Sequence, residues 1–152
     1  MKYLKKYNES QDNEELKESF TKISNECLAY LIDDGYQLCL SDSDLWRDKG
    51  NPKSKILGNK YTTIDFRINK PDFELFTWKD IKDDFIPFLE LVSEKFKIVD
   101  QITNNEITKV SQPFIFYTST GTYTLSLDNL INDKISEMSR IKWITFKINN
   151  YI

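Results

Sequence analysis

Apolar side chains follow two different spacings along this chain, and that contrast constrains the fold more than any other feature of the sequence. Across residues 16–31 and again across 78–96 they recur at steps of three and four, which predicts two long amphipathic helices. A shorter helix is expected over residues 127–138 on the same grounds. Across residues 64–68 apolar and polar side chains alternate instead, which predicts a strand with one buried face.

The ends of the long helices carry local signals. Asp12 and Glu15 fit a capping box at the start of the first helix, and Gly35 stands where a left-handed residue would end it. Thr77 and Asp80 fit the same capping box at the start of the second helix. Both helices should therefore begin and end close to these residues.

Alternating segments predict the strands. Residues 36–41 and 61–69 are expected to form an antiparallel pair across a long loop, and Thr120-Gly121 indicates a hairpin between two later strands. We interpret Trp143, in the closing strand, as a packing residue. The expected strands cover residues 36–41, 61–69, 97–103, 106–110, 114–119, 122–127 and 141–148.

The predicted fold class is α+β, with two layers: a mostly antiparallel sheet, and two long helices and one short helix on one face of it. Residues 1–12 are expected to be a flexible tail, and residues 13–152 a single α+β domain. Only 39% of the residues are hydrophobic, but 10 Phe, 8 Tyr and 3 Trp are present. Since each aromatic ring buries roughly 150–250 Å², this composition is enough for one core.

The composition also narrows the function. The chain has no histidine, which excludes Ser-His-Asp and Cys-His triads and the usual zinc sites. Cys27 and Cys39 lack the spacing of a metal or redox motif, so we predict two reduced and buried thiols. The net charge of −3 gives no general attraction to nucleic acid. We expect no cofactor and no catalytic residue.

Neither a signal peptide nor a membrane-spanning stretch is evident. The N-terminal lysines are followed by polar residues, and no stretch approaches 18 apolar residues. We therefore expect a cytoplasmic protein with no membrane partner.

A first candidate site lies where the strand at 36–41 ends. Asp42 and Asp44 form a DxD pair there, and two such carboxylates can hold Mg²⁺. The arrangement is superficially similar to the first motif of haloacid-dehalogenase-type phosphatases, which implies a Mg²⁺-dependent phosphoryl transfer. Ser41 interrupts the apolar run, and no parallel βαβ unit follows, so a polar loop with a local turn is the competing interpretation.

A second candidate site is the basic and aromatic loop over residues 42–61. Basic groups beside aromatic rings can hold a phosphate backbone and stack a base, and Trp and Arg are also frequent in protein interfaces. The competing interpretation is an ordinary solvated loop. The residues expected to bind there are Trp46, Arg47, Lys49, Lys53, Lys55, Lys60 and Tyr61.

Two segments resemble small uncharacterised proteins of large tailed bacteriophages: the opening MKYLKKYNES and residues 76–89, FTWKDIKDDFIPFL. The resemblance implies a viral protein, located in the host cytoplasm or in the virion. Internal head proteins of some such phages begin with a similar Met-Lys-aromatic targeting segment that is cleaved after a Glu. By that resemblance residues 1–9 are such a tag, although Tyr7 stands where the cleavage pattern has Leu or Ile.

The function we predict is a viral accessory module that binds a host or viral protein and has no catalytic activity. The alternatives are nucleic-acid binding through the loop at 42–61, a minor or internal particle component targeted by residues 1–9, and the Mg²⁺ enzyme using Asp42 and Asp44.

Overall fold

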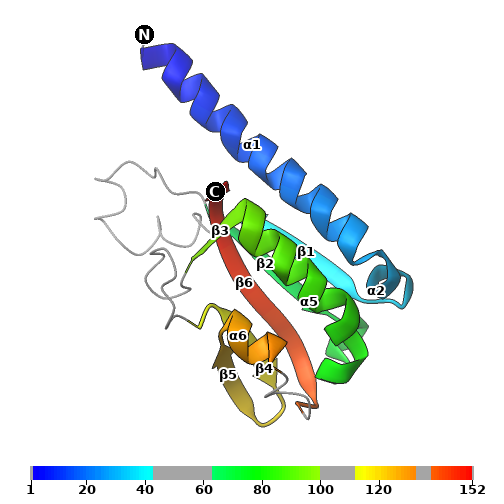
Figure 1. Cartoon of the computed structure of the whole chain (residues 1–152). Helices are drawn as coiled ribbons and strands as arrows, with labels where there is room; N and C mark the ends of the chain where they lie inside the picture. The colour runs from blue at the N-terminus through cyan, green and yellow to red at the C-terminus, as the bar shows by residue number, and fades with distance from the viewer. Residues whose placement is uncertain (1, 43–62, 100–111, 133–137, 152) are drawn as a thin grey trace.

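The computed structural model describes residues 2–42, 63–99, 112–132 and 138–151 (Figure 1). Its helices are α1 (Lys2–Cys27), α2 (Ala29–Asp33), α5 (Trp78–Lys95) and α6 (Leu127–Ile131), with a short 3-10 helix η1 (Pro71–Phe73). Its strands are β1 (Gln37–Asp42), β2 (Ile64–Asn69), β3 (Phe96–Val99), β4 (Phe114–Thr118), β5 (Gly121–Leu125) and β6 (Ile141–Tyr151).

The strands form one antiparallel sheet in the order β1-β2-β6-β4-β5. Strand β6 is the centre of this sheet, because it pairs with β2 through residues 143–148 and with β4 through residues 141–145. Strand β3 pairs with the C-terminal part of β6, at residues 147–151. The edge of β6 opposite β2 is therefore shared by β4 and β3.

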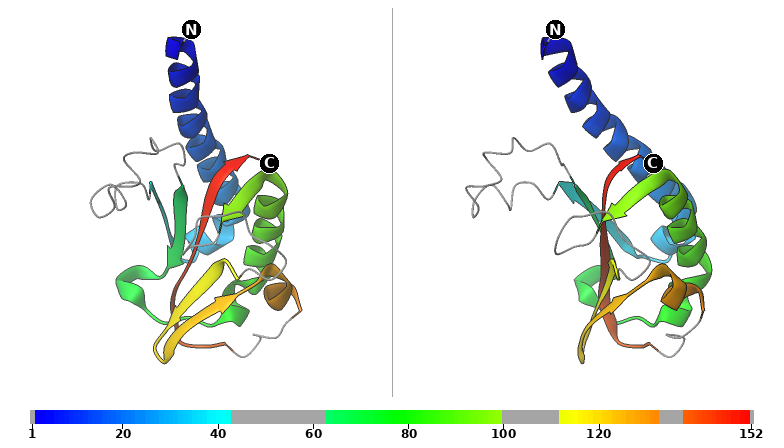
Figure 2. Two further views of the ribbon diagram at one scale, coloured as in Figure 1. Left: turned by 90° about the vertical axis from the view of Figure 1, so that its left-hand side faces the viewer. Right: turned by 60° about the vertical axis from the view of Figure 1, so that its left-hand side comes forward.

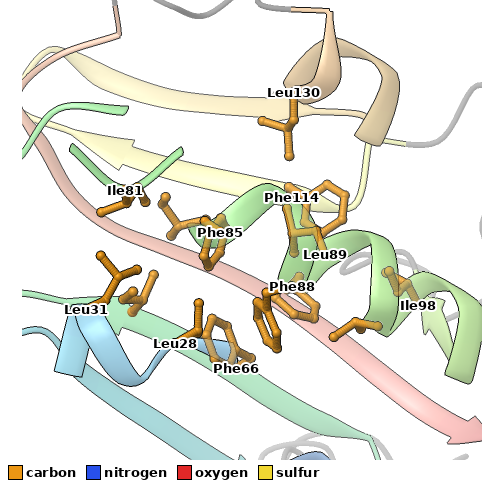
Figure 3. Close-up of a cluster of buried hydrophobic side chains, with 14 of the residues drawn as sticks. Leu28, Leu31, Phe66, Ile81, Phe85, Phe88, Leu89, Ile98, Phe114 and Leu130 are labelled. Atoms are coloured by element: carbon orange, nitrogen blue, oxygen red, sulfur yellow. The ribbon is translucent and has the colours of Figure 1, made fainter. Parts of the chain in front are cut away.

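The four α-helices lie on one side of the sheet, as Figure 2 shows, whereas η1 lies on the other. This arrangement confirms the predicted fold class, a two-layer α+β fold with an antiparallel sheet. In the middle of the sheet the helix-facing side chains are buried and apolar, as at Ile64, Phe66 and Ile68 of β2. They pack against α5 and α2, whose buried leucines and phenylalanines point into the same space (Figure 3).

Aromatic rings fill the middle of this core. Phe66 and Phe146 are paired across β2 and β6, and their ring centroids are 4.9 Å apart. Phe88 of α5 lies 5.3 Å from Phe66 and 6.2 Å from Phe146. Such ring pairs add about 0.5–1.5 kcal/mol each beyond the burial of their area. The aromatic content of the sequence is thus concentrated where the two layers meet.

The first helix differs from the prediction at both ends. The sequence indicated a tail over residues 1–12, but α1 begins at Lys2. No Gly or Pro lies between residues 2 and 34, so no strong helix breaker stops the helix from extending past the capping signal at Asp12. The single helix expected up to Gly35 is also broken at Leu28, which separates α1 from α2. The buried Ser24 donates to the carbonyl of Phe20 (2.7 Å), a bond that often bends helices.

The prediction that Gly35 ends the helical segment is confirmed. Its φ is +99°, and the N–H groups of Gly35 and Tyr36 donate to the carbonyls of Ile32 and Leu31, each at 3.0 Å. This is the hydrogen-bond pattern of a Schellman motif, with Tyr36 and Leu31 as its buried apolar pair. The motif turns the chain from α2 into the edge strand β1.

Replacing Gly35 by alanine should lower the free energy of unfolding by about 1 kcal/mol, because a side chain at positive φ is strained. No heavy atom lies within 4 Å of an added Cβ, so the cost arises from the backbone rather than from a clash. Urea denaturation measures the change. Gly35→Asn should cost less, since asparagine tolerates this conformation better, and equal costs for both variants would contradict this explanation.

The capping box predicted for the second helix is present at the start of α5. The N–H of Thr77 donates to Oδ2 of Asp80 (3.1 Å). Hydrogen bonds from the backbone and the side chain of Thr77 hold the pKa of Asp80 below its ordinary value. The carboxylate form is therefore favoured in the folded state.

Replacing Asp80 by asparagine should lower the free energy of unfolding by about 0.5 kcal/mol at neutral pH, a small loss because Asp80 is exposed. The folded-state pKa lies below the unfolded one, so this stabilisation is present above about pH 4 and is lost as the pH falls below it. Urea midpoints of both proteins between pH 2 and pH 7 should converge in acid. If the difference between the two urea midpoints did not change with pH, the carboxylate of Asp80 would not be the source of the stabilisation.

The remaining strands agree with the sequence prediction apart from their ends. The two predicted antiparallel pairs are confirmed as β1 with β2 and β4 with β5. The hairpin turn is one residue earlier than expected, at Ser119-Thr120, because Oγ1 of Thr118 accepts from the N–H groups of Thr120 (3.3 Å) and Gly121 (3.2 Å). The strand predicted at 106–110 lies outside the described residues.

Candidate functional site

The face of the sheet opposite the four α-helices is the candidate site. Register places one row of side chains across it, from Gln37 and Asn69 through Trp143 and Tyr117 to Thr122. The adjacent row consists of Cys39, Arg67, Thr145, Ile115 and Thr124. Paired residues of neighbouring strands point to the same face, so each row is a line of neighbours. We call this surface the open face.

The open face is hollowed in its middle. The hollow has a volume of about 480 Å³, and its lining comes from four different strands. It combines one aromatic wall with a cation, an anion, two hydroxyls and a thiol. The lining residues are Cys39, Ser41, Asp65, Arg67, Tyr117, Trp143 and Thr145.

Three aromatic rings and one guanidinium meet beside this hollow. Trp143 stacks on Tyr117, with ring centroids 4.6 Å apart and planes 26° from parallel. Phe73 meets Trp143 nearly edge-on at 5.5 Å, and the guanidinium carbon of Arg67 lies 5.7 Å from the Phe73 ring centre. We call Arg67, Phe73, Tyr117 and Trp143 the aromatic–arginine cluster.

Backbone geometry places Phe73 in the cluster. Asp72 and Phe73 have φ values of +56° and +52°, in the left-handed region that non-glycine residues rarely adopt. Each such residue costs roughly 1–2 kcal/mol. Phe73 is nevertheless 48% exposed, so the strain gains little burial for its ring. Strain of this kind concentrates at functional positions.

A bulge places Trp143 on the open face. Tyr117 of β4 is opposite Trp143, whereas the next residue, Thr118, is opposite Ile141, so Lys142 is the extra residue of β6. Ile141 is buried in the core, and Trp143 is half-buried on the other side. Bulges redirect side chains in this way and are frequent next to binding sites.

The charges of the open face are arranged unevenly. Asp65 forms an ion pair with Lys147, with Nζ and Oδ1 3.9 Å apart. Arg67 lies over Phe73 instead, and its buried Nε has no hydrogen-bond partner among the residues that the structure describes. A buried donor without an acceptor costs about 1–3 kcal/mol. Arg67 thus keeps an unused hydrogen-bond donor on this surface.

Chemically, this arrangement is suited to binding. Flat rings and a guanidinium offer stacking, cation–π contact and planar hydrogen bonding to a carboxylate or carbonyl. No protein-family model matches the chain, and neither a curated protein nor a solved structure matches it. The open face is therefore interpreted from its own geometry.

Within the described ranges, no three His, Cys, Asp or Glu side chains are grouped as metal ligands. Asp42, predicted to begin a loop, is instead the last residue of β1, opposite Ile64. The other predicted site residues lie outside the described residues, namely Asp44, Trp46, Arg47, Lys49, Lys53, Lys55, Lys60 and Tyr61. As for a membrane, none of the described helices has the length and apolarity needed to span one.

Two sequence interpretations change with the structure. Cys39 was expected to be buried but is exposed on the open face, because Leu38 and Leu40 take the helix-facing positions of β1. Trp143 packs, but against Tyr117 and Phe73 rather than in the core. The alternation of Asp65 and Arg67 with buried neighbours already indicated that one side of this strand faces solvent. Which residues of other strands lie on the same side depends on the register of the strands.

Proposed function

We propose that this chain is a non-catalytic module that binds a host or viral protein, and that the open face is its contact surface. The observation that carries the proposal is the aromatic–arginine cluster beside the hollow. Trp, Tyr and Arg are the residues that most often dominate the binding energy of protein interfaces, and here they are neighbours on one face.

The electrostatics favour a protein over a nucleic acid. Lys147 is paired with Asp65, and Arg67 is the charged residue within the cluster. A surface that follows a phosphate backbone normally carries a row of unpaired basic groups. One guanidinium within an aromatic cluster instead suits a partner that presents a carboxylate or a backbone carbonyl beside an apolar side chain.

The strain at Asp72 and Phe73 supports the same proposal. Phe73 is held in a costly conformation while remaining 48% exposed, and it completes the cluster from outside the sheet. A partner that covers Phe73 and Trp143 would bury both rings. The strained turn would then contribute to binding, since the rings are already oriented before contact.

Affinity purification of the tagged chain from its native cells, with and without nuclease, tests the proposal. The expected result is one stoichiometric protein that is retained after nuclease treatment and lost from Trp143→Ala. Tyr30, 76% exposed on α2, provides the matched control, because Tyr30→Ala removes an exposed ring from the other layer. Recovery that collapses under nuclease would overturn the proposal in favour of nucleic-acid binding.

A further inference from the structure

Strand β5 is a free edge of the sheet. It pairs with β4 and with no other described strand, and Gly121–Thr124 are exposed. Proteins usually protect such edges with Lys, Pro or a bulge. Strand β5 has none of these among its residues, GTYTL, and its pairing with β4 is regular throughout.

The surroundings of this edge are uncharged and partly apolar. No Asp, Glu, Lys or Arg occurs from Gln112 to Leu127, in a chain that is 30% charged. Tyr123 faces the helix side, as its partner Phe116 does, and is 44% exposed. Ile131 of α6, in the helix layer that covers this side, is 43% exposed. An exposed backbone edge is thus combined with exposed apolar side chains.

The turn determines which backbone groups of β5 are free. Thr118 and Gly121 close the two-residue turn as a hydrogen-bonded pair, and in an antiparallel ladder such pairs alternate with non-hydrogen-bonded ones. Tyr123 is then hydrogen-bonded to β4. The N–H and C=O groups of Thr122 and Thr124 point away from β4, toward the free edge.

We infer that the occupant of this edge is a second copy of the chain, whose β5 pairs antiparallel with β5 about a two-fold axis at Tyr123. This register is self-consistent. Thr122 of each copy is opposite Thr124 of the other, so the outward backbone groups meet as hydrogen-bonded pairs. Tyr123 meets its own copy at the non-hydrogen-bonded position, where side chains are closest.

Self-complementarity distinguishes a second copy from an unrelated segment. The pairing produces one aromatic pair and two Thr–Thr pairs, both of which stabilise antiparallel sheets. Because the edge is uncharged, two identical edges meet without like charges, as a symmetric interface requires. The contact is a short one, so the dimer is expected to dissociate on dilution.

Sedimentation equilibrium of the full chain, from low micromolar to near-millimolar concentration, tests this inference with two matched double variants. Thr122→Lys/Thr124→Lys places like charges opposite each other and should raise the dimer Kd at least tenfold. Thr122→Lys/Thr124→Glu places each Lys opposite a Glu and should keep the chain dimeric. A monomeric wild type, a dimeric Lys/Lys variant or a monomeric Lys/Glu variant would each overturn it.

Disulfide trapping in a Cys27→Ser/Cys39→Ser background tests the register separately and covers the case in which the Lys/Lys variant does not fold. Tyr123→Cys places two thiols at the non-hydrogen-bonded pair and should cross-link readily on oxidation. Thr124→Cys is the control, since the two-fold axis sets its copies too far apart for a disulfide. Equal cross-linking of both variants would refute the register. Neither experiment depends on the partner of the open face.

Discussion

Replacing Phe20 by alanine should lower the free energy of unfolding by about 3–5 kcal/mol, the range for a large buried aromatic residue. Phe20 is fully buried, and its ring lies 5.3 Å from Phe96 and 6.0 Å from Phe66. It also contacts Phe146 at 6.1 Å and Phe88 at 6.2 Å. The residue joins α1 to α5 and to the sheet, so its loss leaves a cavity where both layers meet.

Denaturant unfolding followed by tryptophan fluorescence measures this change. A loss of this size is a large share of the roughly 5–15 kcal/mol by which domains are stable, so the variant should unfold at a much lower denaturant concentration. Lys22→Ala, at an exposed position of the same helix, should change stability by no more than about 0.5 kcal/mol. A Phe20→Ala cost similar to that of Lys22→Ala would contradict the docking of α1.

Replacing Trp143 by alanine should weaken binding to the purified partner roughly thirtyfold, which corresponds to about 2 kcal/mol. The indole contacts both Tyr117 and Phe73, so its removal also disorganises the neighbouring rings. Titration calorimetry with the partner recovered by affinity purification gives the Kd. Trp143→Phe should show an intermediate loss, because it retains one flat ring.

Two comparisons separate binding from folding in this experiment. Tyr30→Ala should leave the Kd unchanged, and the melting temperatures of all variants report whether the fold is retained. Arg67→Lys keeps the positive charge but loses the planar guanidinium above Phe73. If the contact depended on charge alone, this variant would bind almost as well as the wild type. Since the guanidinium is also needed for stacking and planar hydrogen bonds, we expect weaker binding. A folded Trp143→Ala variant with wild-type affinity would exclude the open face as the contact surface.

The parts of the fold that depend on local signals were predictable from the sequence. The helical spacing at 78–96, the capping box of Thr77 and Asp80, and the glycine at the end of α2 all act within a few residues. The alternation along β2 likewise identifies its buried side. The break at Leu28 was not predictable in this way, because it depends on tertiary packing and not on a local signal. Both Leu28 and Leu31 are buried in the same core.

The candidate site was missed because its members are distant in sequence. Arg67, Phe73, Tyr117 and Trp143 become neighbours only through the register of β2, β6 and β4 and the bulge at Lys142. Sequence reasoning favoured the loop at 42–61, where basic and aromatic residues lie close together along the chain. Cross-strand rows have no such local signature, since a shift of one residue would exchange the two faces.

The position of β6 has a consequence for how the protein is made. This strand lies at the centre of the sheet, yet it follows β2, β3 and β4 in the chain. While a ribosome synthesises the chain, those strands emerge without their common neighbour, and Phe66 and Phe116 lack the cover that β6 provides. The sheet can therefore complete only after residues 141–151 leave the exit tunnel, and until then its unpaired edges and apolar side chains are exposed to aggregation.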